Sequence, residues 1–454
     1  MISRGSQVGD CPVNVTERAW GLSRGHSVMR QASRALVVTV LIVLGGMLPV
    51  PIPAAYAKED LAAKCLAAAV QMSPEDRIAA CTAMIDGETA PLQRLVWARL
   101  TRADAYLKTQ QFDLAIGDYD RVILQFPDNI VARLARAYAH CRQGNIAASL
   151  ADYEDVIGRD PQNAAGYLGR AGTRMTEGDL DGAIADYERA MKVHPDNVQA
   201  YLGRSAAYRA KDDLDRAIAD CNKAIAISPE RQYGYLCRGS VYRAKDDLDH
   251  AMADFVHAVQ LDPKDLRAKA AIAGIHQSRG EQEAELAALD EAIRLNSQNA
   301  WIYRLRGFAR IQADLLPDAI EDLHRSIELD PKWPYTRLWL EIALQRSRQP
   351  SQLADAAKGL DMEKWPAPLI CLFLRETTVD AVLAAADDLI ISKKRGQVCE
   401  ANFYAGELAL SQGAVEEAGR LLRLAVDECP RTFIERSAAK ADLRRLEAAS
   451  RDPY

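Results

Sequence analysis

YRAKDDLDRAIADCNKAI, at residues 208–225, recurs with few changes as YRAKDDLDHAMADFVHAV at residues 242–259, one interval of 34 residues later. A proline recurs at the same interval, with Ser297 standing in one place, at Pro127, Pro161, Pro195, Pro229, Pro263 and Pro331. A fixed period of this length indicates a stacked array of helix–turn–helix units. The sequence therefore predicts an all-α superhelical solenoid of about ten helical hairpins, a fold that offers long binding surfaces.

Placing the recurring proline at repeat position 32 gives each repeat a defined start. The starts are Val96, Ile130, Ala164, Val198, Gln232, Leu266 and Ala300, with a partial repeat at Pro334. Small residues then occupy positions 8 and 20, and a mostly bulky residue occupies position 24. Small residues allow the two helices of a hairpin to approach closely, and the residue at position 24 fills the space beside them. Glycine at position 15 in three repeats suits the end of a helix.

This pattern resembles the tetratricopeptide repeat family, strongly over residues 96–347 and more weakly over most of the remaining chain. The resemblance implies a right-handed superhelix whose first helices line a concave groove through positions 2, 5, 9 and 12. It also implies that the groove binds a peptide or a protein. The leucines at position 5 and small residues at position 9 do not fit the lysine–asparagine clamp that some members use for C-terminal carboxylates.

The sequence departs from the family at position 7, where an arginine replaces the usual apolar residue. Position 23 of the same repeats is aspartate, and repeat 6 lacks both, with Ile272 and Ala288. Positions 7 and 23 face each other in a hairpin that turns near position 15, so we predict an ion pair in each of six repeats. The pairs are Arg102–Asp118, Arg136–Asp152, Arg170–Asp186, Arg204–Asp220, Arg238–Asp254 and Arg306–Asp322. The alternative is an arginine ladder for an acidic ligand.

The predicted groove is apolar and includes two arginines. Its candidate binding residues are Leu168, Leu202, Arg209, Tyr233, Leu236, Arg243, Trp301, Phe308 and Tyr335. This composition suits an extended or helical peptide with aliphatic anchors and an acidic flank. The alternative is that the chain's own segment 350–398 packs over Trp301 and Tyr335.

The N-terminal region 1–57 has the features of a secretory signal. Arg30 and Arg34 precede an apolar run that ends in small residues at Ala55 and Ala57. This pattern predicts cleavage after Ala57, a true start at Met29 and export to a bacterial periplasm. The alternative is an uncleaved anchor in the inner membrane. No cysteine follows the cleavage site, so we expect no lipid anchor.

Cleavage would remove five basic and two acidic residues from a chain of formal charge −6. A chain this acidic argues against nucleic acid as a partner.

Export permits disulfides, and the repeat register suggests two of them. Cys65 and Cys81 are spaced like positions 8 and 24, so a bond between them would staple an N-terminal hairpin within residues 58–95. Cys399 and Cys429 occupy positions 1 and 31 of a last repeat, so both lie at one end of its hairpin. Buried thiols are the alternative for the first pair. The expectation for Cys141, Cys221, Cys237 and Cys371 is a free or buried thiol.

The expected organisation comprises a tandem array at 96–349, an irregular helical segment at 350–398 and a last hairpin with a polar-faced capping helix at 399–454. Within the last region, CEANFYAGELALSQG and CPRTFIERSAAKADLRRL resemble the C-terminal end of NlpI-type bacterial periplasmic lipoproteins, over about residues 397–447. That resemblance implies an adaptor that brings cell-envelope proteases or peptidoglycan hydrolases together.

The motif search found no catalytic, metal-binding or cofactor-binding signature. We therefore expect a non-catalytic exported adaptor that binds a protein or peptide, without a cofactor. The alternatives are a chaperone-like holder of exported proteins, a regulatory subunit of a cell-envelope enzyme and a homo-oligomeric structural protein.

Overall fold

A computed structural model describes residue 65 and residues 72–87, 91–388, 391–430 and 433–451. The predicted signal region 1–57, with its start at Met29 and its cleavage site, lies outside these residues. The described residues are helical, with no strand among them, which confirms the all-α class. They form two compact units that divide between Ala200 and Tyr201, within one helix.

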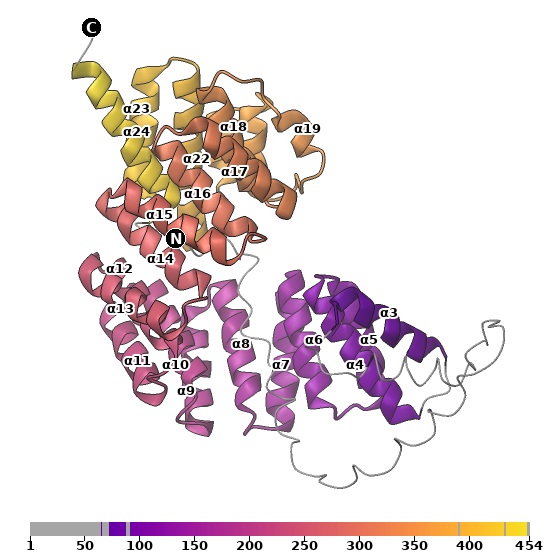
Figure 1. Ribbon diagram of the computed structural model, residues 1–454. Helices are drawn as coiled ribbons and strands as arrows, with labels where there is room; N and C mark the ends of the chain where they lie inside the picture. The colour runs from indigo at the N-terminus through magenta and orange to yellow at the C-terminus, as the bar shows by residue number, and fades with distance from the viewer. Residues whose placement is uncertain (1–64, 66–71, 88–90, 389–390, 431–432, 452–454) are drawn as a thin grey trace, which may run out of the picture. The chain divides into compact units, whose positions relative to one another are not determined.

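The unit that ends at Ala200 contains consecutive antiparallel helix pairs (Figure 1). Its helices are α3 (Pro74–Asp86), α4 (Leu92–Lys108), α5 (Phe112–Gln125), α6 (Ile130–Gln143), α7 (Ile146–Arg159), α8 (Ala164–Glu177) and α9 (Leu180–Val193). The boundary falls in α10 (Val198–Ala210).

The unit that begins at Tyr201 continues the repeats and then becomes irregular. Its repeats comprise α11 (Leu214–Ile227), α12 (Gln232–Ala244), α13 (Leu248–Leu261), α14 (Leu266–Arg279), α15 (Gln282–Leu295), α16 (Ala300–Gln312) and α17 (Leu316–Leu329). They are followed by α18 (Pro334–Arg346), α19 (Leu353–Ala357), α20 (Ala367–Phe373), α21 (Val379–Ala385), α22 (Ile391–Ser411), α23 (Val415–Glu428) and α24 (Ile434–Arg451).

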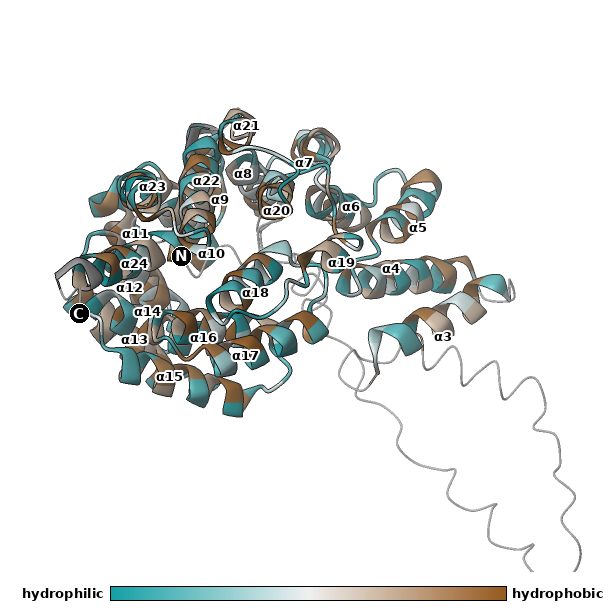
Figure 2. Ribbon diagram, turned by 90° about the horizontal axis from the view of Figure 1, so that it is seen from above, coloured by the Kyte–Doolittle hydropathy of each residue, from teal (hydrophilic) through white to brown (hydrophobic). Residues whose placement is uncertain are grey.

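The 34-residue register predicts where helices begin. First helices start at each predicted repeat start from Ile130 to Pro334, and only α4 starts early, at Leu92 instead of Val96. Asparagine or aspartate side chains cap many of these starts; Asn129, for example, accepts a hydrogen bond from the backbone N–H of Ala132. Such caps satisfy donors that a helix leaves unpaired. The apolar side of each helix then packs inward, and α15, α17 and α23 show one apolar and one polar side in Figure 2.

The predicted contact between positions 8 and 24 forms the core of the hairpins. A β-carbon added to Gly239 would lie 2.7 Å from the Phe255 ring, and one added to Gly307 would lie 2.9 Å from Leu323. The small residue at position 8 is therefore required by the close approach of the second helix. Each hairpin consequently has a small core of its own, such as that of Ala171, Ala183 and Tyr187.

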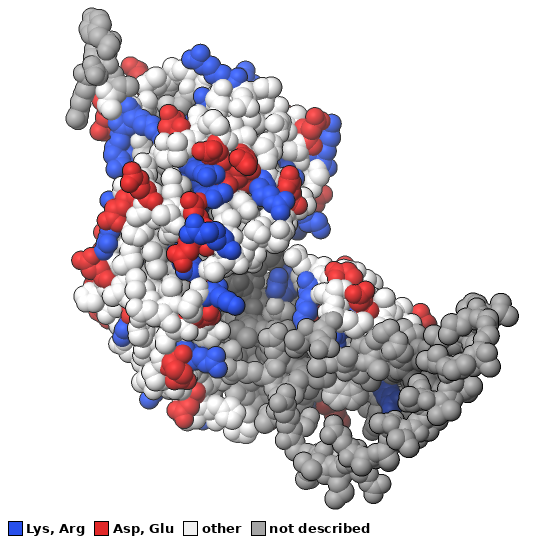
Figure 3. Space-filling model, in the orientation of Figure 1, with Lys and Arg blue, Asp and Glu red and all other residues white. Residues whose placement is uncertain are grey.

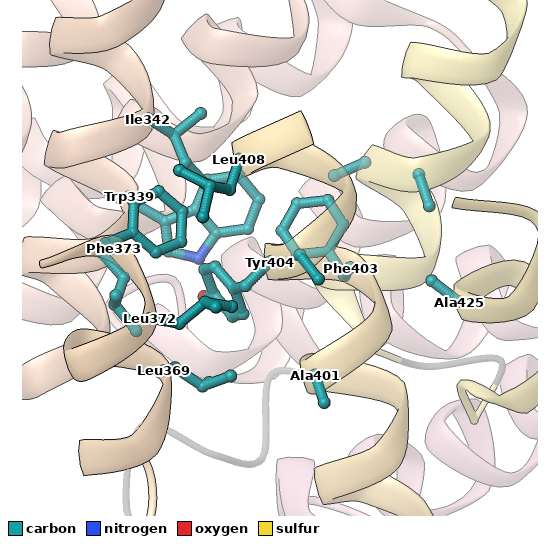
Figure 4. Packing of buried hydrophobic residues seen from close by; sticks show 14 of the residues in the cluster. Trp339, Ile342, Leu369, Leu372, Phe373, Ala401, Phe403, Tyr404, Leu408 and Ala425 are labelled. Carbon is teal, nitrogen blue, oxygen red and sulfur yellow. The ribbon is translucent and has the colours of Figure 1, made fainter. Parts of the chain in front are cut away.

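The last part of the chain has a single larger core, which we call the C-terminal block (residues 308–446). Trp339, Phe403 and Tyr404 are almost completely buried at its centre, in contact with one another (Figure 4). Its members come from α16 to α24, so helices far apart in sequence share one core.

Candidate peptide-binding face

The first helices of the repeats lie on the inner side of the local curve. Within the described residues, α6 contacts α8, α12 contacts α14 and α16 contacts α18, whereas successive second helices make no comparable contacts. The face formed by the first helices is therefore the more enclosed one, as expected for a groove.

All six predicted arginine–aspartate pairs form, each with two hydrogen bonds from Nε and Nη2 to the two carboxylate oxygens. The Nη2 to Oδ1 distances are 2.7 Å for Arg102–Asp118, 2.6 Å for Arg136–Asp152, 2.7 Å for Arg170–Asp186, 2.7 Å for Arg204–Asp220, 2.8 Å for Arg238–Asp254 and 2.6 Å for Arg306–Asp322. The side chains are partly buried, and hydrogen bonding to Asp254 raises the pKa of Arg238. This bidentate geometry holds the two helices of each hairpin in register.

The remaining guanidinium nitrogen of several of these arginines reaches the preceding repeat. Nη1 of Arg136 bonds to Asp120 at 2.6 Å, and Nη1 of Arg306 bonds to Asp290 at 2.6 Å. Arg238 uses Asn222 in the same way at 2.7 Å. Because their donors are already occupied within the chain, these arginines favour the structural interpretation over a ladder for acidic ligands.

Arg209 on α10 and Arg243 on α12 differ from the position 7 arginines because neither forms an ion pair within the described residues. Both are half-buried, and the buried Nε of Arg243 has no hydrogen-bond partner. Burial, together with the nearby charge of Arg209, lowers the pKa of Arg243 to about 10. Two neighbouring cations without an acidic partner form a site that favours an anion.

Tyr233 and the leucines Leu202 and Leu236 supply apolar surface on the same two helices. Tyr233 is 43% exposed, and the guanidinium carbon of Arg267 lies 5.4 Å from its ring centre. Leu202 and Leu236 are half-buried, with Leu236 packed on the Phe255 core. The structure thus brings five of the predicted groove residues together on α10 and α12.

The other predicted groove residues are placed differently. Leu168 lies on α8 in the preceding unit, and Trp301 packs beside the core of α14 to α16. Phe308 is buried against Trp339 with ring centres 4.7 Å apart, and the Tyr335 hydroxyl donates to Glu400 at 2.8 Å. For these last two residues the structure favours packing by the chain itself, because α18 and α22 cover them.

The structure contains both predicted disulfides, Cys65–Cys81 and Cys399–Cys429. It also corrects the expectation of thiols for two other cysteines, since Cys221 on α11 is bonded to Cys237 on α12. Cys141 is disulfide-bonded as well, whereas Cys371 is a thiol. The sequence contained a signal for the third bond, because 16 residues separate Cys221 from Cys237, the same separation as in Cys65–Cys81. The bond was missed because it joins successive repeats, rather than the two helices of one hairpin.

The sequence did not predict the polar interactions inside the C-terminal block. Nη2 of Arg346 bonds to Glu407 at 2.7 Å and to Asp442 at 2.8 Å, and Arg445 also reaches Asp442. Burial and the neighbouring Asp442 raise the pKa of Glu407. These pairs join residues up to 96 positions apart, outside the reach of a repeat register.

The surface carries both signs of charge. On the face drawn in Figure 3, basic and acidic side chains of residues 201–451 are interspersed. Across the described part of the chain, no helix is long and apolar enough to cross a membrane, and no cluster of potential metal ligands occurs.

An array of helical hairpins with an enclosed face of first helices defines the class of helical repeat scaffolds. Family models described as "Tetratricopeptide repeat" match residues 100–164, 168–231 and 234–265. The chain is a tetratricopeptide repeat protein, and such repeats indicate a scaffold for protein–protein interaction.

Solved tetratricopeptide repeat proteins resemble parts of the chain. One from Parabacteroides merdae is 15% identical, covers 55% of this chain and 98% of its own, and has a TM-score of 0.45. A thermophilic one from Thermus thermophilus is 20% identical, covers 40% of this chain and 98% of its own, and has a TM-score of 0.37.

Proposed function

We propose that the protein is an exported, non-catalytic scaffold that binds an acidic peptide segment across α10 and α12. The observation that carries this proposal is the unpaired state of Arg209 and Arg243. Six other arginines on first helices are saturated by aspartate, so these two are conspicuous as a pair in adjacent repeats that lacks one. A carboxylate placed between them would offset their mutual repulsion and the cost of their burial.

The neighbouring apolar surface indicates what else the segment would contain. Exposed Tyr233 offers an aromatic ring, and Leu202 and Leu236 offer aliphatic contacts. Tyrosine and arginine are frequent anchors at protein interfaces. The proposed ligand is therefore a peptide with acidic residues beside aliphatic ones.

Export is supported by the disulfides. Three bonds join described cysteines, and disulfides persist mainly in oxidising compartments. A thiol titration of protein isolated under alkylating conditions tests this part. Recovery of Cys65, Cys81, Cys399 and Cys429 as thiols from its native compartment would contradict it.

The binding site is tested with a fluorescein-labelled peptide in which two glutamates flank leucines, compared by fluorescence polarisation with its glutamine counterpart. We expect the wild-type protein to prefer the glutamate peptide, and the Arg209→Gln/Arg243→Gln variant to lose about tenfold in affinity for it. Arg231→Gln, at an exposed position just before α12, is the charge-matched control for the single variants and is expected to bind normally. Equal binding of both peptides by the wild-type protein would refute the site.

A further inference from the structure

A cavity of about 380 Å³ lies between α17, α18 and the segment that leads into α19. Its apolar walls are Ile327, Leu340, Leu344 and Leu353, and its charged groups include Arg337 and Glu341. A volume of this size is at the lower end of the range for sites that bind small molecules. The cavity is formed by other helices than the proposed peptide site, so the two proposals stand or fall separately.

The cavity exists because one hairpin lacks a full second helix. In the repeat that begins at Ala300, the second helix α17 starts 16 residues later and is 14 residues long. In the repeat that begins at Pro334, the equivalent span starts at Pro350 and contains only the five-residue α19. Proline lacks a backbone N–H and disfavours helical conformation in the residue before it. Space that a second helix would fill therefore remains beside α18.

The missing helix also leaves Arg337 without a partner. Two other repeats have a cation at this position 4, and each pairs with a carboxylate at position 26 of its second helix, as Arg133–Asp155 and Lys269–Glu291. In the repeat of Arg337, position 26 is Gly359, which has no carboxylate. The Nε and Nη1 atoms of Arg337 are buried and have no hydrogen-bond partner. Leaving such donors unsatisfied costs about 1 to 3 kcal/mol, so a ligand that pairs with them has a clear energetic advantage.

Glu341 provides the opposite charge one helical turn from Arg337. Its carboxylate is 3% exposed and accepts one hydrogen bond on each oxygen, from Gln345 Nε2 at 2.9 Å and from Ser351 Oγ at 2.8 Å. A carboxylate has about four acceptor positions, so it can still accept an N–H donor from a ligand. The cavity thus combines a cation, an anion and an aliphatic wall.

We propose that this cavity binds a free aliphatic α-amino acid. The ligand carboxylate would pair with Arg337, its ammonium group with Glu341, and its side chain would contact Leu340, Leu344 and Leu353. A zwitterion satisfies both charges, whereas a simple anion would be repelled by Glu341 and a simple cation by Arg337.

Isothermal titration of the full chain with L-leucine tests the proposal. We expect saturable binding of one leucine, and at least about tenfold weaker binding of leucinamide, which lacks the carboxylate, and of 4-methylpentanoate, which lacks the ammonium group. No binding of leucine, isoleucine or valine up to about 10 mM would overturn the proposal. Equal binding of leucine and 4-methylpentanoate would also overturn it, because Glu341 would then have no role.

Arg337→Gln is expected to weaken leucine binding at least about tenfold without unfolding the protein, because Arg337 has no partner to lose. Arg133→Gln is the matched control, since it removes the position 4 arginine of a repeat with a complete second helix, and it should bind leucine as the wild type does. Circular dichroism of both variants checks folding. Unchanged leucine affinity in a folded Arg337→Gln variant would refute the assigned site.

Discussion

The regular repeats are held by small cores and ion pairs between helices, whereas the C-terminal block encloses one large core rich in aromatic residues. In the repeats, contacts join neighbours in sequence, as between Ala183 and Tyr187 or Arg204 and Asp220. In the block, Trp339 contacts Phe403 more than 60 residues away. This difference teaches that stability in the array is local and additive, while stability in the block depends on a few central side chains.

The largest expected effect is in the block. Trp339→Ala should destabilise the protein by about 3 to 5 kcal/mol, because the indole is 1% exposed and its removal leaves a cavity among three aromatic rings. Hydrogen exchange should show lost protection in α18 and α22 but not in α6 and α7. Leu124→Ala, at a position 80% exposed, is the control and should change stability by less than about 0.5 kcal/mol. Equal loss of protection in α6 and α7 would mean that the two regions are not distinct.

An ion pair of the array gives a smaller effect that can be reversed. Asp220→Ala should cost about 3 kcal/mol, because it leaves the partly buried Arg204 without its partner. Adding Arg204→Ile should recover most of this loss, since repeat 6 naturally combines Ile272 with Ala288 at these positions. Urea denaturation of the two single variants and the double variant measures the coupling. A double variant no more stable than Asp220→Ala would show that the pair does more than fix the register.

Repeat 6 contains a conflict that mutation should relieve. Glu285 occupies position 20, where other repeats have alanine, and burial raises its pKa from 4.5 to about 8. The folded state therefore holds a proton that the unfolded state releases between pH 4.5 and 8, so this residue makes the protein less stable as the pH rises through that window.

Glu285→Ala should accordingly stabilise the protein by about 2 kcal/mol at pH 8 and have little effect at pH 4. Thermal unfolding of both proteins across this range measures the difference. A stability difference that does not change with pH would argue against a protonated Glu285.

The smallest effect concerns the turns between helices. Asp246 has φ of 67° at the position where Gly144, Gly178 and Gly280 also have positive φ. Asp246→Gly should stabilise the protein by about 0.5 to 1 kcal/mol, because glycine adopts this conformation without strain. Gly178→Ala is the reciprocal control and should destabilise by a similar amount in the same thermal unfolding measurement. Destabilisation by both changes would contradict the explanation.

The sequence predicted those features that repeat with the period. Helix starts, the contact between Gly239 and Phe255, and the six ion pairs all follow from one register. The local disulfide Cys65–Cys81 followed for the same reason.

The features missed by the sequence depend on contacts that no period describes. Covering of Tyr335 by Glu400, the Arg346–Glu407 pair and the cavity at Arg337 all arise after Pro350, where the register ends. Cys221–Cys237 was missed although it lies inside the register, because pairing within one hairpin was the only pattern considered. The resemblance of residues 397–447 to NlpI-type lipoproteins stays a prediction.

The Cys221–Cys237 bond has a mechanical consequence for the face that it underlies. Helical repeat arrays bend by small changes at each junction between neighbouring hairpins, and non-covalent junctions can yield a little under load. The junction between the hairpins that carry Arg209 and Arg243 is covalently closed, with Ser205 Oγ within 3.3 Å of both sulfur atoms. It is a stiff link in an elastic chain, so the spacing of the two guanidinium groups is expected to persist when the rest of the array flexes.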